Sequence, residues 1–598
     1  MADYKTFSQF FQYITKLYKD NPAIHWRSEK NKGQYDSISG NKIKELVYIT
    51  SKALVKFNLK PGDKAAIISE TRFEWVIADF ACISNQVVTV PIYNTMTASQ
   101  IKYILEHSES KLCFVSSKNI CDKVDAVFND LPHLQKIITF NKAGNASENI
   151  IHFGDLVYGE VVSGKLPYNE TEADEYFEKA TSQSKEDDIL TIIYTSGTTG
   201  DPKGVSLSHK NILSNVRQCD DSFKVITSED VFLSFLPLAH TYERTAGYYY
   251  PLSVGAKVYY AQSIDTLQTQ MVETKPTIIL CVPLLLTRMH SRFLKAVESM
   301  KGLKKFISQK ALSIGSRHRE NKNNFLWKLA DNRVFTQFRE RTGGRMRYFI
   351  SGGSALNKET AEFFDSIGLT ILQGYGMTEA SPVISVNRPD KNKIGTVGVP
   401  LEDVIVKIAQ DGEILAAGAN VMTGYYKNET ETSETIINGW LHTGDIGVID
   451  EDGFLKITDR KKTLIKTAGG KYISLTHIED VVGESNYVSQ IITFASDERQ
   501  FVSALVIPDL DELKKYAATQ SISFTSDENL IKNEKIHDFM ADEINTSQKN
   551  LAKYERIRKF ALLHSPFTIE SGEMTPTLKL KRKIIESNYK NLIDNFYK

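Results

Sequence analysis

The first 180 residues alternate between helical and strand-like patterns of apolar positions. Apolar side chains recur every three to four residues over 42–57, 75–83 and 99–108, which predicts helices. Short apolar runs at 65–68, 87–92 and 112–115 predict buried strands, and we expect Pro91 to end the second. Because strands and helices that alternate at this spacing form βαβ units, we predict an α/β fold built on a largely parallel sheet.

The pattern changes further along the chain. Residues 141–185 are polar and acidic, and we expect a surface connection there. An apolar strand is predicted over 231–240, ending at His240, and two more strands over 348–351 and 369–373. Residues 290–345 are rich in Lys and Arg with helical spacing, which predicts a solvated helical insertion.

A glycine-rich stretch at 194–204 directly follows a β-branched strand predicted over 189–194. Backbone N–H groups of such a loop can point at an anion, while hydroxyls and a lysine add donors and charge. It is not a Walker loop, because Pro202 precedes Lys203 and Gly204 follows it where that motif needs a hydroxyl residue. The stretch therefore predicts a polyphosphate site, and the alternative is an ordinary surface turn.

Two more short glycine-containing motifs follow predicted strands, at 352–356 and 374–379. In the first, a flat backbone would let a purine ring lie close. In the second, glycines bring the backbone near a ligand, Tyr375 can stack, and Thr378 and Glu379 offer oxygens suited to Mg²⁺. Each word alone is also what an ordinary strand-to-helix turn looks like.

His240 and Asp445 are single residues with a functional and a structural interpretation. His240 ends a predicted strand, where open α/β sheets bind ligands, although a lone histidine there is usually structural. Tyrosines downstream of it would line an apolar pocket or simply fill the core. Asp445 follows a tight glycine turn and could accept both hydroxyls of a ribose.

Composition narrows the class of protein. A chain of 598 residues with 41% hydrophobic and 24% charged residues is an ordinary globular protein with more than one domain. Its 73 basic residues balance 73 acidic ones, which argues against a nucleic-acid binder. No apolar run is long enough to span a bilayer, and residues 1–6 carry no export signal. Five scattered cysteines indicate reduced thiols in a cytosolic protein.

Taken in their order along the chain, the sequence motifs described above resemble the motif set of the adenylate-forming (AMP-binding) superfamily. The set comprises 194–204, 236–244, 352–356, 374–379, 440–445, 459–462 and 573–579. Within the superfamily, 453–462, the ending 575–579 and the pair Glu243-Arg244 are similar to long-chain fatty acid–CoA ligases. The resemblance implies a large N-terminal domain of parallel-sheet βαβ subdomains, residues 1–459, and a small mobile α+β C-terminal domain, residues 460–598.

The resemblance also implies a two-step reaction that uses ATP, Mg²⁺ and coenzyme A. A fatty acid carboxylate attacks the α-phosphorus of ATP, and coenzyme A then displaces AMP from the acyl-adenylate. By motif, the nucleotide would be bound by Thr195, Ser196, Gly197, Thr198, Thr199, Gly200, Lys203, Gly353, Ser354, Ala355, Gly374, Tyr375, Gly376, Thr378, Asp445 and Arg460. The catalytic residues would be Lys579, Thr378, Glu379 and His240, with Glu379 on the metal and Lys462 at the hinge between the domains.

Two departures from the family pattern bear on these assignments. The Ser-Gly-Lys word expected before the C-terminal helix is Thr577-Leu578-Lys579 here, so Lys579 rests on its position and Lys581 is its rival. Some bacterial relatives carry a gating Trp four residues past the His240 position, where this chain has Arg244.

Two other functions stay open at this point. One is an adenylating enzyme that passes its acyl group to a free carrier protein, and the other is a non-catalytic nucleotide or lipid sensor with the same fold. The predicted partners are small molecules, without nucleic acid or a transmembrane segment. We expect a cytoplasmic protein, and leave open a peripheral contact of 290–345 with anionic lipid or coenzyme A phosphates.

Overall fold

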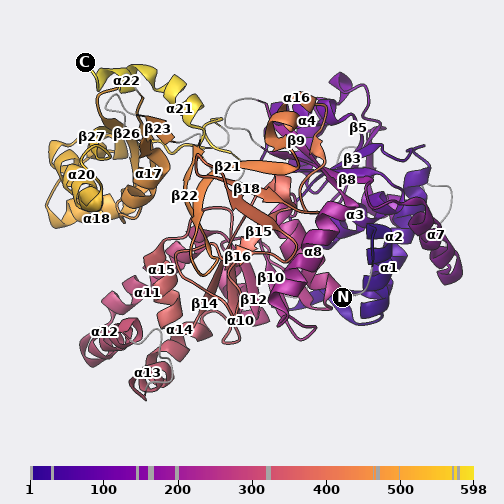
Figure 1. The fold of residues 1–598 in the computed structure, drawn as a ribbon, viewed down its shortest axis with the longest axis horizontal. Coiled ribbons are helices and arrows are strands. Elements are labelled where there is room, and N and C mark those ends of the chain that lie inside the picture. The colour runs from indigo at the N-terminus through magenta and orange to yellow at the C-terminus, as the bar shows by residue number, and fades with distance from the viewer. Residues whose placement is uncertain are drawn as a thin grey trace.

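The computed structural model describes residues 4–28, 33–142, 147–158, 168–195, 201–317, 325–461, 464–466, 472–496, 499–568, 571–575 and 580–598 (Figure 1). It has a large body of three sheets with their helices and a smaller C-terminal unit beside it (Figure 1). The predicted α/β fold with a large N-terminal and a smaller C-terminal domain is confirmed. None of the helices within these ranges is long and apolar enough to cross a membrane.

The first sheet has eight strands in the order β19-β9-β8-β4-β3-β5-β6-β7. Strands β3 to β8 pair in parallel, whereas β8-β9 and β9-β19 are antiparallel. The bounds are β3 (Lys64–Ile68), β4 (Val88–Ile92), β5 (Ser110–Val115), β6 (Lys136–Thr139), β7 (Ile150–His152), β8 (Ile189–Thr195), β9 (Lys203–Ser208) and β19 (Gly424–Tyr425). Pro91 lies inside β4 rather than ending it, because the strand continues to Ile92.

The second sheet has nine strands in the order β16-β15-β14-β13-β12-β10-β11-β1-β2. Its strands from β14 to β1 are parallel and its outer pairs are antiparallel. The bounds are β1 (Pro22–Arg27), β2 (Tyr35–Ser39), β10 (Val231–Ser234), β11 (Lys257–Tyr260), β12 (Ile278–Cys281), β13 (Tyr348–Ser351), β14 (Thr370–Gly376), β15 (Val383–Val386) and β16 (Val399–Pro400).

A third, antiparallel sheet completes the large domain. It contains β17 (Ile405–Ile408), β18 (Glu413–Ala417), β20 (Ile436–Ile437), β21 (Trp440–Ile449) and β22 (Leu455–Arg460). Asn438 and Gly439 form the turn between β20 and β21, both with positive φ, 52° and 79°. This geometry suits Asn-Gly hairpin turns, so the sequence Asn438-Gly439 sets the start of the strand that carries Asp445.

Helices cover the sheets, and several of them begin at residues whose side chains cap them. Thr97 and Ser208 form capping boxes with Gln100 and Asn211 at the starts of α4 and α8. The helices of the large domain are α1 (Phe7–Tyr18), α2 (Gly40–Val55), α3 (Phe73–Ser84), α4 (Ala98–Ser108), α5 (Lys118–Asp125), the 3₁₀ turn η1 (Phe128–Asp130), α6 (Phe153–Tyr158), α7 (Glu170–Gln183), α8 (His209–Phe223), the π-helical η2 (Glu243–Tyr249), α9 (Tyr250–Ser253), α10 (Leu267–Thr274), α11 (Pro283–Ser299), α12 (Gly302–Arg317), α13 (Phe325–Ala330), the π-helical η3 (Asp331–Phe335), α14 (Thr336–Glu340), α15 (Lys358–Ser366), the 3₁₀ turn η4 (Thr378–Ala380) and α16 (Glu429–Thr435).

Helix α1 is part of the core, although it opens the described chain. Phe7, Phe10 and Phe11 are at most 1% exposed. The ring of Phe7 lies 4.5 Å from that of Tyr249, and the Phe7 N–H donates to Nδ1 of His209 at 3.0 Å. Strand β1, which follows, pairs in parallel with β11. The start of the large domain is therefore completed by segments more than 200 residues away.

Two further expectations from the pattern were wrong. The polar stretch 141–185 is not only a connection, since it contains β7, α6 and α7, and Phe177 of α7 is 2% exposed against the core. The apolar run 231–240 is a strand only as far as Ser234. Pro237 lacks the N–H that a central strand needs, and its carbonyl accepts from the His240 N–H in a turn.

The C-terminal unit has hydrophobic clusters of its own, made from Ile473 onward. Its elements are β23 (Leu464–Lys466), β24 (Tyr472–Ser474), α17 (Leu475–Gly483), β25 (Val488–Phe494), β26 (Val502–Pro508), α18 (Leu510–Thr519), α19 (Asp527–Ile531), α20 (Glu534–Ser547), β27 (Ile557–Leu562), α21 (Arg582–Asn588) and α22 (Lys590–Asn595). Polar contacts link it to the large domain, including an ion pair of Lys295 with Glu512 at 2.7 Å.

Candidate active site

The glycine-rich stretch connects the two strands of a hairpin. Thr195, the last residue of β8, pairs with Lys203, the first of β9. Residues Ser196, Gly197, Thr198, Thr199 and Gly200 lie outside the described part of the chain. Gly204 is required here for packing, because a Cβ would lie 2.8 Å from Ile192 across the hairpin. The strand β9 therefore separates the predicted phosphate loop from helix α8.

A tyrosine distant in sequence joins the hairpin to the 374–379 word. Strand β19 pairs with β9, which places Tyr425 opposite Val205. The Tyr425 hydroxyl donates to Oε1 of Glu379 at 2.8 Å, and the Nζ of Lys203 lies 5.3 Å from the Tyr425 ring centre. Burial and the Glu379 carboxylate raise the pKa of Tyr425 well above its usual range, so its hydroxyl stays a donor. Lys203 and Glu379 are thus brought to one place.

Lys203 also has a carboxylate partner that the sequence did not suggest. Its Nζ contacts Oε1 of Glu431, in the first turn of α16. Both side chains are partly exposed, at 23% and 31%. The lysine predicted to bind phosphate is therefore held by an acidic residue that a phosphate group would have to replace or share.

Asp445 is the centre of a second group. It lies opposite Arg460 in the antiparallel pair β21–β22, and the Nε of Arg460 donates to its Oδ1 at 2.9 Å. The hydroxyl of Tyr375, from the end of β14, donates to Oδ2 at 2.6 Å. The three residues come from three strands and meet at one carboxylate, whose side chain is 10% exposed. The structure thus brings together the residues assigned to the ribose and one assigned to the base.

The glycines of 374–376 have a structural cause. A Cβ on Gly376 would lie 2.0 Å from the carbonyl oxygen of Pro382, and one on Gly374 would lie 3.3 Å from that of Ser385. Both contacts are with the neighbouring strand β15 and its approach, not with open space. The close backbone approach that we assigned to a ligand is therefore already made by the protein itself.

His240 and the turn at 352–355 face one another through Tyr242. The Nδ1 of His240 accepts from the Tyr242 N–H at 3.1 Å, which leaves Nε2 to carry the proton of a neutral ring. The Tyr242 ring lies 3.2 Å from where a Cβ on Gly352 would be, and its hydroxyl donates to the Ile350 carbonyl at 2.8 Å. Gly353, Ser354 and Ala355 are exposed beyond it.

Arg244 is not placed as a gate. It is fully buried and donates to Asp79 of α3 at 2.5 Å, to Thr89 and Thr191 at 2.8 Å, and to Tyr249 at 2.9 Å. Tyr249 in turn donates to the other Asp79 oxygen at 2.6 Å. The guanidinium is thus occupied inside the structure by partners on α3, β4, β8 and η2.

Glu243, the neighbour of Arg244, is buried without such partners. It is 1% exposed, and neither carboxyl oxygen has a hydrogen-bond partner among the described residues. Its carboxyl lies against Gly247, where a Cβ would be 2.5 Å from Oε1. Burial raises the pKa of Glu243 to about 8, against a smaller opposing effect of Ser234. Glu243 is therefore protonated at neutral pH.

A Glu243→Gln variant is expected to gain stability relative to the parent protein as the pH rises. The parent pKa is about 8 when folded and 4.5 as the ordinary value, so the folded state holds the extra proton between these limits and the parent loses stability there. The difference in unfolding free energy should grow on the order of 1 kcal/mol per pH unit, measured by denaturant unfolding between pH 5 and pH 8. A difference that stays constant with pH would contradict a neutral Glu243.

Lys461 directly follows strand β22 and is held by two carboxylates. Its Nζ contacts Asp411 at 2.6 Å and Glu413 at 3.0 Å, and both carboxylates raise its pKa. Glu413 is also bound by His442 at 3.0 Å and by the Gly444 N–H at 2.9 Å. Lys462 and Lys579, the predicted hinge and catalytic lysines, lie outside the described residues.

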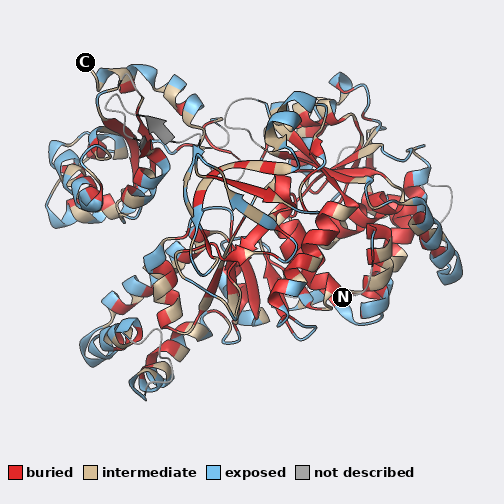
Figure 2. Ribbon diagram, in the orientation of Figure 1, coloured by how far each residue is buried: buried red, intermediate tan, exposed pale blue. Residues whose placement is uncertain are grey.

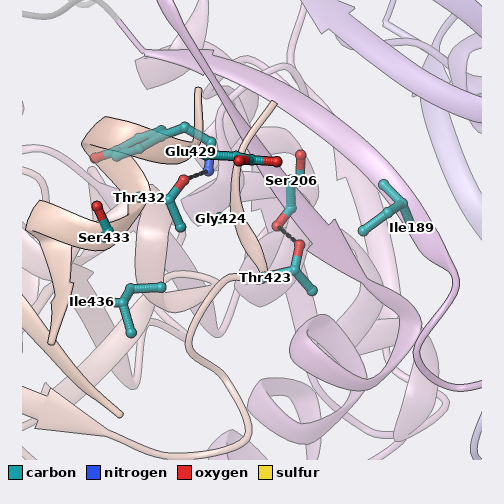
Figure 3. A pocket seen from close by; sticks show the side chains of 9 residues that line it. Ile189, Ser206, Thr423, Gly424, Glu429, Thr432, Ser433 and Ile436 are labelled. Carbon is teal, nitrogen blue, oxygen red and sulfur yellow. Dashed lines mark hydrogen bonds between the residues drawn. The ribbon is translucent and has the colours of Figure 1, made fainter. Parts of the chain in front are cut away.

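A pocket of about 420 Å³ lies beside this site but does not coincide with it (Figure 3). It is lined by Ile189, Ser206, Thr423, Gly424, Tyr425, Glu429, Thr432, Ser433 and Ile436. Thr423 donates to the Ser206 carbonyl and the Tyr425 N–H donates to Thr432, each at 2.9 Å (Figure 3). None of the residues predicted from the sequence lines it, and Thr423, Glu429 and Ser433 are exposed.

Comparisons with known proteins agree on one family. The family described as "AMP-binding enzyme" matches residues 11–426. Long chain acyl-CoA synthetase 4 of Arabidopsis thaliana is 30% identical over 98% of this chain and 91% of its own. Long-chain-fatty-acid–CoA ligase 5 of Rattus norvegicus is 32% identical over 100% of this chain and 89% of its own. The solved adenylation domain of a carboxylate reductase from Mycobacterium chelonae is 21% identical, with a TM-score of 0.75 over 99% and 91% of the two chains.

Proposed function

The chain belongs to the AMP-binding enzyme family, and on this premise we propose that it is a long-chain fatty acid–CoA ligase. It consumes a fatty acid, ATP and coenzyme A and forms acyl-CoA, AMP and pyrophosphate. The observation that carries the proposal is a pair of groups that the chain links: Lys203 and Glu379 meet at Tyr425, and Tyr375 and Arg460 meet at Asp445, with Tyr375 four residues before Glu379. Residues suited to phosphate and metal thus lie at the start of β9 and just after β14, and residues suited to the ribose lie on the paired strands β21 and β22.

The reaction divides into two displacements. In the first, a carboxylate oxygen of the fatty acid bonds to the α-phosphorus of ATP while pyrophosphate leaves. In the second, the thiolate sulfur of coenzyme A bonds to the acyl carbon and AMP leaves with the electron pair of the broken bond. Neither step needs a covalent bond to the protein, so positioning and neutralisation of charge supply the catalysis.

We assign the phosphate end of ATP to the hairpin and to Glu379. Thr195 and Lys203 flank the predicted loop residues 196–200, and Thr378, the first residue of η4, would contact the α-phosphate. Glu379 fits a magnesium ion, because Mg²⁺ in proteins is held by one or two carboxylates together with substrate phosphates. When bound, the metal would neutralise phosphate charge, and Tyr425 holds the Glu379 carboxylate in place for it.

The nucleoside end is assigned to Asp445 and its partners. The Asp445 carboxylate would accept the ribose hydroxyls, with Arg460 and Tyr375 fixing its orientation. The exposed turn of Gly353, Ser354 and Ala355 offers its backbone to the adenine ring. His240 lies next to this turn through Tyr242 and would face the acyl group.

The second step is assigned to a rotation of the C-terminal domain. Lys579 would neutralise charge between carboxylate and α-phosphate in the first step, and a turn about Lys462 would then exchange it for the coenzyme A site. Lys461, bound to Asp411 and Glu413, gives this rotation a fixed starting point. We further propose a cytoplasmic enzyme that contacts the membrane only peripherally.

A pyrophosphate-release assay with fatty acids of graded chain length tests the function. We expect release that requires both the carboxylate and ATP, and thioester formation with coenzyme A. Thioester formed only with acyl carrier protein would indicate a different acceptor. Purified protein without carboxylate-dependent exchange of pyrophosphate into ATP would refute the enzymatic proposal altogether.

A Lys203→Ala variant is expected to raise the KM for ATP about tenfold or more and to lower kcat less. Lys203 lies on the leaving-phosphate side and shares its charge with Glu431, so it positions phosphates rather than carrying the chemistry. Steady-state kinetics at varied ATP would measure the split, with Glu431→Gln as the control that keeps the lysine. A Lys203→Ala enzyme as inactive at saturating ATP as Lys579→Ala would overturn this ranking.

A further inference from the structure

Helices α12 and α13 form a tip that projects from the large domain (Figure 1). They belong to the long connection between the neighbouring parallel strands β12 and β13. Their outer sides are largely exposed (Figure 2). The proposed reaction uses no residue of α12 or α13, so it does not explain which side chains these two helices expose.

The inner side of the tip is packed against the large domain. Ala311 and Gly315 of α12 are buried, and a Cβ on Gly315 would lie 3.0 Å from both the Phe335 ring and the Ser366 carbonyl. The indole N–H of Trp327 in α13 donates to the same carbonyl at 2.9 Å. These contacts fix which faces of the two helices point outward.

The outward face of α12 carries large apolar side chains at helical spacing. Leu303, Phe306 and Ile307 are 72%, 59% and 38% exposed, and Lys310 continues the same stripe, with its Nζ 5.5 Å from the Phe306 ring. On α13, Phe325, Leu326 and Leu329 are 71%, 48% and 42% exposed. Apolar surface gathered in this way marks an interaction site in a folded protein.

The charge of the tip has one sign. Residues 301–317 contain five basic residues and no acidic one, in a chain whose basic and acidic residues balance at 73 each overall. Of these, Lys301, Lys304, Lys310 and Arg317 are exposed. Helices that lie in the interface of an anionic membrane typically carry lysine and arginine interleaved with Phe and Leu, as α12 does.

We infer that the tip formed by α12 and α13 docks on a lipid surface that contains anionic headgroups. The apolar stripe would enter the headgroup region while the lysines and Arg317 pair with lipid phosphates, their aliphatic stems lying along the apolar side chains. The charge complementarity is what selects an anionic lipid surface over an apolar protein partner. This docking rests on the peripheral membrane contact proposed above and gives it a place on the chain and a lipid chemistry. It can be tested apart from the reaction, because binding to lipid requires no turnover.

The test is cosedimentation of the full chain with vesicles of phosphatidylcholine alone and with about one third phosphatidylglycerol. We expect binding to the anionic vesicles only, weakened by salt. Lys304→Glu with Lys310→Glu should weaken it at least about thirtyfold, since each lysine near an anionic surface contributes roughly a factor of five. Leu303→Ser with Phe306→Ser should weaken it about tenfold or more.

Matched variants control for general effects of charge and polarity. Lys52→Glu with Lys56→Glu reverses two exposed lysines at the end of α2, and Ile405→Ser removes an apolar side chain that is 62% exposed. Both controls should bind anionic vesicles like the parent protein. All variants should keep their activity on a short, water-soluble fatty acid, so loss of docking and failure of the proposed function remain distinguishable.

Three results would overturn the inference. The first is equal binding to neutral and anionic vesicles, and the second is binding that the tip variants leave unchanged. The third is a parent protein that does not bind vesicles but self-associates, as measured by light scattering, while the variant with Leu303→Ser and Phe306→Ser is monomeric. That result would make the tip an interface between copies of the chain.

Discussion

The Lys579→Ala variant is expected to lose acyl-adenylate formation by roughly 10²–10³-fold while still converting supplied acyl-adenylate and coenzyme A to thioester. In the proposed first step, negative charge on the carboxylate and on the α-phosphate must approach each other, and the lysine ammonium reduces that repulsion. In the second step the thiolate attacks the acyl carbon rather than the phosphorus, and the proposed rotation has by then exchanged Lys579 for the coenzyme A site. Pyrophosphate release and thioester formation from synthetic adenylate, measured separately, would resolve the two steps.

Lys581 provides the matched comparison. It lies two residues on, at the start of α21, and its N–H donates to the Glu573 carbonyl at 2.8 Å. Lys581→Ala removes an equal charge from the same segment and should leave adenylate formation within a few-fold of the parent. If Lys581→Ala lost the first step and Lys579→Ala kept it, the assignment would pass to Lys581.

The Arg244→Met variant is expected to destabilise the large domain by about 3–5 kcal/mol. Methionine fills similar space but cannot donate a hydrogen bond. Of the two hydrogen bonds that Asp79 accepts from Arg244 and Tyr249, only the one from Tyr249 would then remain to the buried carboxylate. An uncompensated buried charge is one of the most costly defects in a protein interior. All four tryptophans precede residue 459, so denaturant unfolding followed by Trp fluorescence reports on this domain.

Two further variants separate this stability from a role in substrate choice. Combining Arg244→Met with Asp79→Asn should recover part of the loss, because both charges are then gone. Lys295→Met, which breaks the exposed pair with Glu512, should cost less than about 1 kcal/mol. A stable Arg244→Met enzyme with altered preference for chain length would instead indicate an acyl gate.

Local patterns were sufficient for the framework of the fold. Helix α2 and strands β3 to β5 were predicted to within a few residues, because apolar spacing and burial are properties of the segment itself. The motif words likewise indicated Asp445, Arg460 and Tyr375, which the structure brings together around one carboxylate.

Non-local pairing set the part that sequence patterns missed. Tyr425 and Glu431 reach Glu379 and Lys203 only because β19 pairs with β9, more than 200 residues earlier in the chain. Arg244 and Glu243 are adjacent charged residues, and the sequence pattern does not distinguish their surroundings. In the structure Arg244 pairs with Asp79 on α3, whereas the Glu243 carboxyl has no hydrogen-bond partner among the described residues. The sequence pattern predicts that the backbone at Gly376 lies close to a ligand. In the structure it lies close to Pro382 instead, because β15 returns beside β14, and the local pattern does not show this pairing.

The position of α1 has a consequence for the order in which the chain can fold during synthesis. Phe7 leaves the ribosome roughly 240 residues before Tyr249, against which it packs, and β1 precedes its partner β11 by a similar stretch. At about 5–20 residues per second, the side of α1 that packs on Phe80 of α3 is covered within roughly 4–15 s, whereas the side that meets Tyr249 stays uncovered for on the order of 12–50 s. The nascent large domain therefore passes through a long interval in which its first helix needs protection from aggregation.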